Sequence, residues 1–132
     1  MSFNFGAVLA VFLAGSAAPG DSGSATPAGI QALSPVIAPA AVKKLIASSA
    51  KFVLVDVREP EEFAAGHIDG AVLMPLATLE TAYRGLPKGT KLVVYCRSGK
   101  RSAKAVTFLL THGYRRAVSL DGGFVAWSAQ PQ

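Results

Sequence analysis

Short apolar runs alternate with amphipathic stretches along the chain from about residue 34 to its end. The apolar runs are rich in β-branched and aromatic residues and predict strands at 34–37, 51–57, 71–74, 91–95 and 117–120. Between them, apolar residues recur every three or four positions, which predicts helices at 39–48, 59–65, 76–84 and 124–128. A further helix is predicted to begin at about residue 101 and to end where Gly113 can form a left-handed cap. Strands that alternate with helices pair in parallel through right-handed crossovers. The pattern therefore predicts an α/β fold, with a small parallel sheet of about five strands flanked by helices on both faces.

Individual positions indicate which side chains face the core. In the first helix, Val42, Leu45 and Ile46 share one stripe and are expected to point inward. The strand at 51–57 is almost continuously apolar, as is typical of a strand covered on both faces. Trp127 is expected to anchor the core rather than to form a platform for a ligand.

The only cysteine of the chain, Cys96, lies where the strand at 91–95 ends and the next helix begins. A helix N-terminus presents unpaired N–H groups and the positive end of the helix dipole, and both stabilise an anion. Cysteines in such settings commonly have pKa values of about 3.5 to 7.5, so the thiolate is favoured. Small residues let the loop curl into an anion-binding nest, and basic residues add positive charge. The loop residues are Arg97, Ser98, Gly99, Lys100 and Arg101.

A lone cysteine at the end of a strand is also typical of a small buried hydrophobic residue, so its position alone leaves two interpretations open. The two histidines do not extend the site. His112, beside Gly113 at the end of a helix, is interpreted as a capping cation. One cysteine and two widely spaced histidines do not form a metal site.

Four segments, in a fixed order over about residues 34 to 129, carry a recognisable set of motifs. They are Asp56-Val57-Arg58-Glu59-Pro60-Glu61-Glu62-Phe63, Gly66-His67-Ile68-Asp69-Gly70-Ala71 followed by Pro75, Cys96-Arg97-Ser98-Gly99-Lys100-Arg101-Ser102, and Leu120-Asp121-Gly122-Gly123 followed by Trp127. These segments resemble the signatures of rhodanese-domain sulfurtransferases, in the order and at the spacings of that family.

The resemblance implies a thiosulfate:cyanide sulfurtransferase that needs no metal or organic cofactor. Cys96 would attack the outer sulfur of thiosulfate or a similar anionic donor, form a persulfide and release sulfite. An acceptor, which is cyanide, a small thiol or a protein thiol, would then take the outer sulfur. Backbone N–H groups of residues 97 to 101 would hold the charge of the persulfide. Arg97, Lys100 and Arg101 would recruit the donor, and Arg101 is expected to point inward.

The resemblance assigns structural parts to three further residues near the site. Asp56 and Arg58 would tie loops together, with acid–base catalysis by Asp56 as the alternative. His67 would be a hydrogen-bonded structural histidine rather than a general base. Leu73 departs from the family, which often has asparagine two residues before the proline of the second motif. That departure bears on the local loop geometry and not on the cysteine chemistry.

Two functions of other classes stay open. Phosphatases and arsenate reductases also use a cysteine in an anion loop, and cell-cycle phosphatases share the rhodanese fold. In their loops five residues separate the cysteine from the arginine, whereas four separate Cys96 from Arg101. The loop of this chain is therefore short for a tetrahedral oxyanion. The other alternative is a persulfide carrier, a partner-binding module that passes sulfur on without turning over thiosulfate.

The charge of the chain fits small anions better than nucleic acid. The formal net charge is +5. Outside the cysteine loop the basic residues lie singly or in pairs, and no run of basic and aromatic residues indicates nucleic-acid binding. We therefore expect small anionic donors or an acidic partner, and nothing in the sequence calls for more than a monomer.

The first 33 residues differ in composition from the rest. Phe5 to Ala18 is an apolar run shorter than the ~20 residues of a membrane-spanning helix. Small residues at 16–18 suit a signal peptidase, although the segment before the run has no lysine or arginine. We predict a signal peptide at 1–18, a flexible linker at 19–33 and the folded domain at 34–132, which gives a periplasmic or secreted protein without a membrane span. An uncleaved anchor, a misassigned start codon and a cytoplasmic location are the alternatives.

Overall fold

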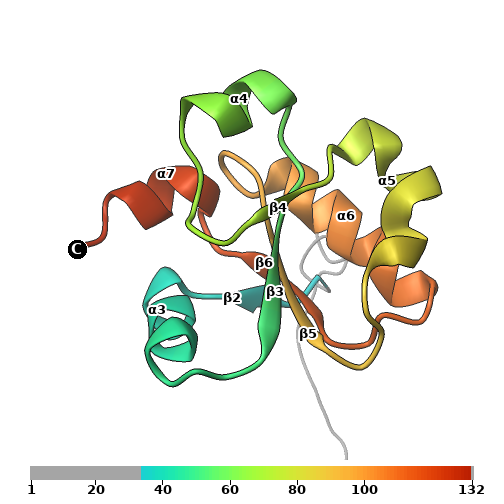
Figure 1. Ribbon diagram of the computed structural model, residues 1–132, viewed down its shortest axis with the longest axis horizontal. Coiled ribbons are helices and arrows are strands. Elements are labelled where there is room, and N and C mark those ends of the chain that lie inside the picture. Colours follow the sequence, from blue (N-terminus) through green and yellow to red (C-terminus); the bar gives the residue numbers. More distant parts are fainter. Residues whose placement is uncertain (1–33, 132) are drawn as a thin grey trace, which may run out of the picture. The chain divides into compact units, whose positions relative to one another are not determined.

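Five parallel strands form one sheet in the order β2-β6-β5-β3-β4, which places β5 at the centre (Figure 1). The computed structural model describes residues 34–131, and the predicted signal peptide (1–18) and linker (19–33) lie outside them. The strands are β2 (Val36–Ile37), β3 (Phe52–Asp56), β4 (Val72–Leu73), β5 (Lys91–Tyr95) and β6 (Ala117–Leu120). The helices are α3 (Pro39–Ala47), α4 (Pro60–Ala65), α5 (Leu76–Ala82), the 3₁₀-helix η2 (Tyr83–Gly85), α6 (Lys100–Thr111) and α7 (Gly123–Ser128).

The parallel α/β prediction is confirmed, and the bounds of β5 and β6 are those expected from their apolar runs. The helix predicted at 76–84 instead ends at Ala82 and tightens into η2. There the N–H of Leu86 donates to the carbonyl of Tyr83 at 2.9 Å. Gly85 and Pro87 disfavour a further α-helical turn, which explains the early end.

One inward-facing prediction is wrong. Val42 is fully buried and Leu45 is half-buried, but Ile46 is 47% exposed. Ile46 lies in the last turn of α3, where it lines an open groove with Phe52 and Trp127 instead of packing into the core. The apolar stripe of α3 therefore stops being covered before the helix ends.

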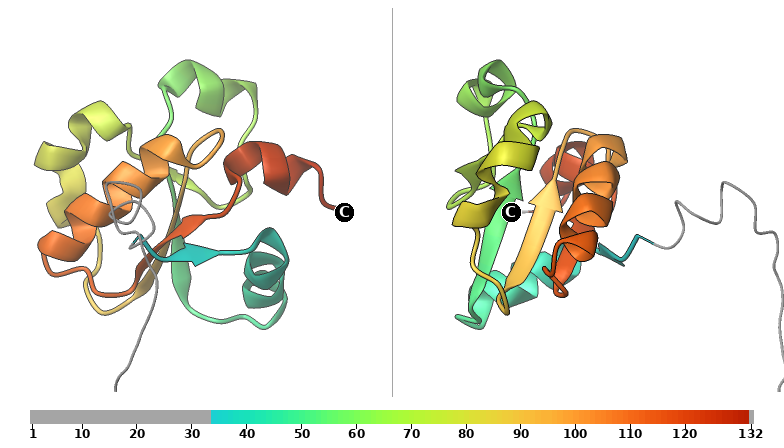
Figure 2. Two further views of the ribbon diagram at one scale, coloured as in Figure 1. Left: turned by 180° about the vertical axis from the view of Figure 1, so that it is seen from behind. Right: turned by 90° about the vertical axis from the view of Figure 1, so that its right-hand side faces the viewer.

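The helices divide between the two faces of the sheet. α5 and α6 cover one face and α3 and α7 the other, as Figure 1 and the reverse view in Figure 2 show. Side chains of β5 alternate between these two layers, as they must in a strand. Leu92, Val94 and Cys96 pack on the α5/α6 side, whereas Val93 and Tyr95 pack on the α3/α7 side. This alternation turns the side chain of Cys96 toward α6.

The site lies at the carboxyl ends of the strands, where open α/β sheets bind their ligands. β3 and β5 end side by side, with Asp56 paired in register with Tyr95. Helix α4, which follows β3, and the loop that follows β5 therefore lie at the same end of the sheet (Figure 1). The first and third sequence motifs meet there.

Candidate active site

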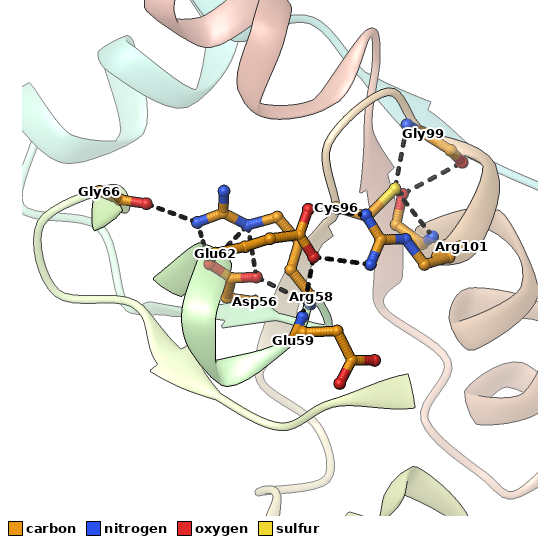
Figure 3. A network of polar contacts seen from close by, with 9 residues as sticks. Asp56, Arg58, Glu59, Glu62, Gly66, Cys96, Gly99 and Arg101 are labelled. Carbon is orange, nitrogen blue, oxygen red and sulfur yellow. Dashed lines mark hydrogen bonds and ion pairs between the residues drawn. The ribbon is translucent and has the colours of Figure 1, made fainter. Parts of the chain in front are cut away.

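The loop between β5 and α6 folds around the sulfur of Cys96. Gly99, the N-cap of α6, has a φ of 112°, a left-handed conformation that favours glycine. This conformation directs the N–H of Gly99 at Sγ, 3.0 Å away, and the N–H of Ser102 lies 3.4 Å from the same atom. Figure 3 shows the sulfur held between the loop and the start of the helix. The anion nest expected from the sequence is thus directed at the sulfur itself.

The surroundings of Cys96 favour its ionised form. Burial alone would raise the pKa of the thiol, because Cys96 is only 1% exposed. Hydrogen bonds from the side chain and backbone of Ser102 and from the N–H groups of Gly99 and Ser98 outweigh that effect, and the pKa is lowered. Cys96 is therefore both buried and in surroundings that favour the thiolate. The two interpretations left open by the sequence do not exclude each other.

A pair of buried serines lies behind the sulfur, and sequence reasoning missed it. Ser102 is fully buried, and in the thiol form Sγ donates to its Oγ over 3.6 Å. The Oγ atoms of Ser102 and Ser119 are 2.7 Å apart. Ser102 is the last residue of the cysteine motif, and this position is a signal that could have assigned it to the site. Ser119 is a single polar residue in the apolar run of β6, and nothing near it in the sequence points to the site.

The start of α7 fixes the loop from the other side. The N–H groups of Phe124 and Val125 donate to the carbonyls of Cys96 at 2.8 Å and of Arg97 at 3.0 Å. Gly123 makes this approach possible, because a Cβ at that position would lie 2.5 Å from the carbonyl oxygen of Arg97. The fourth motif therefore holds the backbone of the third.

Arg101 points toward α4 and pairs with Glu62. Its two terminal nitrogens donate to the carboxylate at 2.9 and 3.1 Å (Figure 3). Glu62 also accepts from the N–H of Glu59 at 3.0 Å, as part of the capping box of α4. The hydrogen bonds from Arg101, followed by that from Glu59, lower the pKa of Glu62 to about 2. The positive charge of Arg101, which was expected to recruit the donor, is therefore partly neutralised by the carboxylate of Glu62.

Asp56 and Arg58 form a buried ion pair beside this network. The guanidinium of Arg58 donates to both carboxylate oxygens of Asp56, at 2.9, 3.1 and 2.7 Å, and to the carbonyl of Gly66 at 2.7 Å. Its charge also lies 4.5 Å from the ring centre of Phe124. The pair ties the end of β3 to Gly66, at the C-terminal end of α4, and to α7.

The remaining predicted residues lie at the surface. His67 is exposed, stacks on Phe63 and has its Nδ1 2.8 Å from the carbonyl of that residue. Arg97 and Ser98 are exposed on the loop, and Lys100 is exposed as the first residue of α6. A pocket of about 450 Å³ is lined by Arg97, Arg58 and Glu62 together with residues of α7. This pocket combines charged groups of both signs beside the cysteine loop.

Two absences hold for the described part of the chain. Within residues 34–131, no group of three or more acidic, histidine or cysteine side chains is placed to hold a metal ion. No helix of that segment has the length and apolar character needed to cross a membrane.

The arrangement of the motifs can be compared with known proteins. The model of the rhodanese-like domain matches residues 38–130. The chain belongs to the rhodanese-like domain family. It is 39% identical over 83 residues to a protein of Allochromatium vinosum named sulfurtransferase, a match that covers 63% of this chain and 78% of the relative. It is also 39% identical over 98 residues to the mycobacterial "Probable adenylyltransferase/sulfurtransferase MoeZ" of Mycobacterium tuberculosis, covering 73% of this chain but only 25% of that protein.

Solved rhodanese-like structures share the fold. The structure of the human single-domain sulfurtransferase TSTD1 superposes with a TM-score of 0.68 at 28% identity, covering 75% of this chain and 99% of the human one. A rhodanese-like domain protein from Staphylococcus aureus gives a TM-score of 0.67 at 34% identity, covering 70% and 90% of the two chains. The rhodanese-like fold expected from the sequence is confirmed by these matches.

Proposed function

We propose that this rhodanese-like domain is a sulfurtransferase in which Cys96 carries the transferred sulfur as a persulfide, with thiosulfate or a similar anion as donor. The observation that carries this proposal is the pair of N–H groups, from Gly99 and Ser102, that contact Sγ at 3.0 and 3.4 Å. They stabilise a thiolate, which is the nucleophile that the reaction needs. The relatives named as sulfurtransferases support the same reaction class.

The first displacement loads the cysteine. The thiolate of Cys96 attacks the outer sulfur of thiosulfate and forms a new S–S bond. The bond between the two sulfurs of thiosulfate breaks, and its electron pair leaves with sulfite. The persulfide formed keeps one negative charge on its outer sulfur, and we expect the N–H groups of residues 97 to 101 to stabilise it.

The second displacement returns the enzyme to its starting state. Cyanide, or a thiolate acceptor, attacks the outer sulfur, and the electron pair of the broken S–S bond returns to Cys96. The products are thiocyanate, or a new persulfide, and the free thiolate. No proton has to be delivered in either step when the acceptor is an anion, so an acid–base role for Asp56 is not needed.

The surface charges suit an anionic donor. Arg97 on the loop and Lys100 at the start of α6 are both exposed, and within residues 34–131 neither is paired with a carboxylate. Arg101 contributes less positive charge, because Glu62 lies against it. We therefore assign donor recruitment mainly to Arg97 and Lys100, with Arg101 in a supporting part.

The test is the intact mass of the protein after treatment with thiosulfate, with the release of sulfite measured in the same samples. We expect the wild type to gain one sulfur atom and to lose it as thiocyanate when cyanide is added. Cys96→Ser, which removes the thiolate with little change in volume, should gain nothing. No gain of sulfur by the wild type would overturn the thiosulfate reaction, and other sulfur donors would be tested before phosphate esters.

The same samples separate an enzyme from a persulfide carrier. An enzyme produces sulfite well in excess of protein when cyanide is present. A carrier loads one sulfur for each protein molecule and then stops until its partner arrives.

A further inference from the structure

Ser119 is a buried hydroxyl that the reaction described above does not use. It lies on β6 and is 2% exposed. Its Oγ is 2.7 Å from Oγ of Ser102, a typical distance for an O–H···O hydrogen bond. Ser102 Oγ in turn lies 3.6 Å from Sγ of Cys96. The three atoms form a chain that runs from the sulfur into the sheet.

The hydroxyl of Ser102 has one proton and, among the described residues, three neighbours that can accept it. They are Sγ of Cys96, Oγ of Ser119, and the carbonyl of Gly99 at 3.2 Å. The carbonyl of Gly99 already accepts from the N–H of Ala103 at 3.0 Å. This carbonyl stays hydrogen-bonded without Ser102, so the hydroxyl of Ser102 can change its partner when Cys96 is ionised.

The two states of the sulfur place different demands on Ser102. When Cys96 is a thiol, its S–H donates to Ser102, which donates onward to Gly99 or Ser119, so its oxygen is satisfied with or without Ser119. When Cys96 is a thiolate, Ser102 donates to the sulfur and no longer accepts from it. Within residues 34–131, only a proton from Ser119 then satisfies its fully buried oxygen, and an unmet buried acceptor is costly.

We propose that Ser119 is a positioning residue for the sulfur chemistry, because its hydroxyl donates to Ser102 and thereby directs the hydroxyl of Ser102 at the ionised sulfur of Cys96. Hydrogen bonds linked in this way also polarise one another, which strengthens the bond that reaches the sulfur. The inference rests on the proposed function only in taking the thiolate of Cys96 as the reacting form.

The charged groups near the sulfur come from other elements. Arg101 on α6 acts on Cys96 through its charge, and Glu62 on α4 pairs with it. Arg97 lies on the exposed loop, and Lys100 is exposed at the start of α6. A substitution at Ser119 leaves these four charged residues in place. A change in the ionisation of Cys96 would therefore reflect the loss of the hydroxyl of Ser119.

The experiment measures the alkylation rate of Cys96 by iodoacetamide against pH, with no sulfur donor present. It compares the wild type with Ser119→Ala, Ser102→Ala, the double variant, and Val118→Ala as a control on the opposite face of β6. We expect Ser119→Ala to raise the apparent pKa of Cys96 by about half to one unit, the effect of one hydrogen bond. Below that pKa alkylation should slow about three- to tenfold, with the rate at high pH unchanged.

The double variant shows whether Ser119 acts through Ser102. We expect Ser119→Ala to add no further shift once Ser102 is alanine, and Val118→Ala to leave the apparent pKa at its wild-type value. An unshifted pKa in Ser119→Ala would overturn the proposal, and so would a shift of the same size in the Ser102→Ala background. Failure of the protein to take sulfur from thiosulfate would count against the proposed function alone, because alkylation needs no donor.

Discussion

Replacing Gly123 with alanine tests whether the start of α7 sets the shape of the cysteine loop. Gly123 has a φ of 62°, and a Cβ there would lie 2.5 Å from the carbonyl oxygen of Arg97 and 2.6 Å from that of Cys96. Both neighbours are backbone atoms, so no flexible side chain can move aside. The loop itself must retreat, and Sγ moves with it.

The size of the effect follows from two contributions. An alanine in the left-handed region costs about 1–2 kcal/mol, and overpacking adds about 1–3 kcal/mol. Ordinary contacts begin at 3.4 Å, so the loop must move by about 0.9 Å from the 2.5 Å contact. A misplacement on the order of 1 Å can cost about 100-fold in rate. We expect Gly123→Ala to lose about 2–5 kcal/mol of unfolding free energy and about 100-fold in the rate of sulfur loading.

Gly89→Ala is the matched control. Gly89 has a φ of 80°, but a Cβ there would meet no atom of residues 34–131 within 4 Å. This variant carries the backbone cost alone, so it should lose about 1–2 kcal/mol and load sulfur at the wild-type rate. Urea unfolding gives the stabilities, and intact mass against time after thiosulfate addition gives the loading rates. If Gly123→Ala matched Gly89→Ala in both measurements, the contact between α7 and the loop would contribute neither to stability nor to the rate of sulfur loading.

Three further predictions concern the ion pairs and the N-terminus. The pKa of Glu62 is lowered from 4.5 to about 2, so its pair with Arg101 stabilises the fold above about pH 4.5 and this contribution is lost as the pH falls toward 2. Glu62→Gln, which keeps a capping side chain, should therefore lower the unfolding free energy by about 1 kcal/mol at neutral pH and by almost nothing near pH 2. Urea unfolding at the two pH values measures this, and an equal loss at both pH values would contradict it. Asp56→Asn leaves the charge of Arg58 buried without its partner and should cost about 3–5 kcal/mol in the same assay, whereas a loss as small as that of Glu62→Gln would show that the buried pair behaves like a surface one. We also propose that the protein is exported and cleaved after residue 18, to be checked by the mass of the mature N-terminus; an intact Met1 on cytoplasmic protein would refute export.

Much of the fold could be predicted because the decisive signals are local. The runs at 91–95 and 117–120 are mostly apolar, with Lys91 and Ser119 as the exceptions, and they fix the two strands around the site. Likewise, the step from strand to helix after Cys96 was visible in the sequence, and so was the anion nest. These features depend on neighbouring residues, and a single sequence records them directly.

Contacts between distant segments could not be predicted in the same way. The pair of Glu62 and Arg101 joins residues 39 positions apart and exists only because α4 and α6 start at the same end of the sheet. Ser119 reaches Ser102 only after β6 has paired with β5, with Ser119 in register with Val94. The sequence identified the charge on Arg101 but not the carboxylate that shares it. It also gave no sign that Ser119 belongs to the site.

The alternation of side chains along β5 limits how this domain can change over evolutionary time. Cys96 and Tyr95 face opposite layers, and adding or removing one residue within β5 would exchange the two. The sulfur would then face the α3/α7 layer, away from the N–H groups of Gly99 and Ser102. Substitutions in β5 can be repaired by repacking, but a single-residue insertion or deletion there removes the thiolate environment at once. Length variation is therefore expected in the turn before β5 and not within the strand itself.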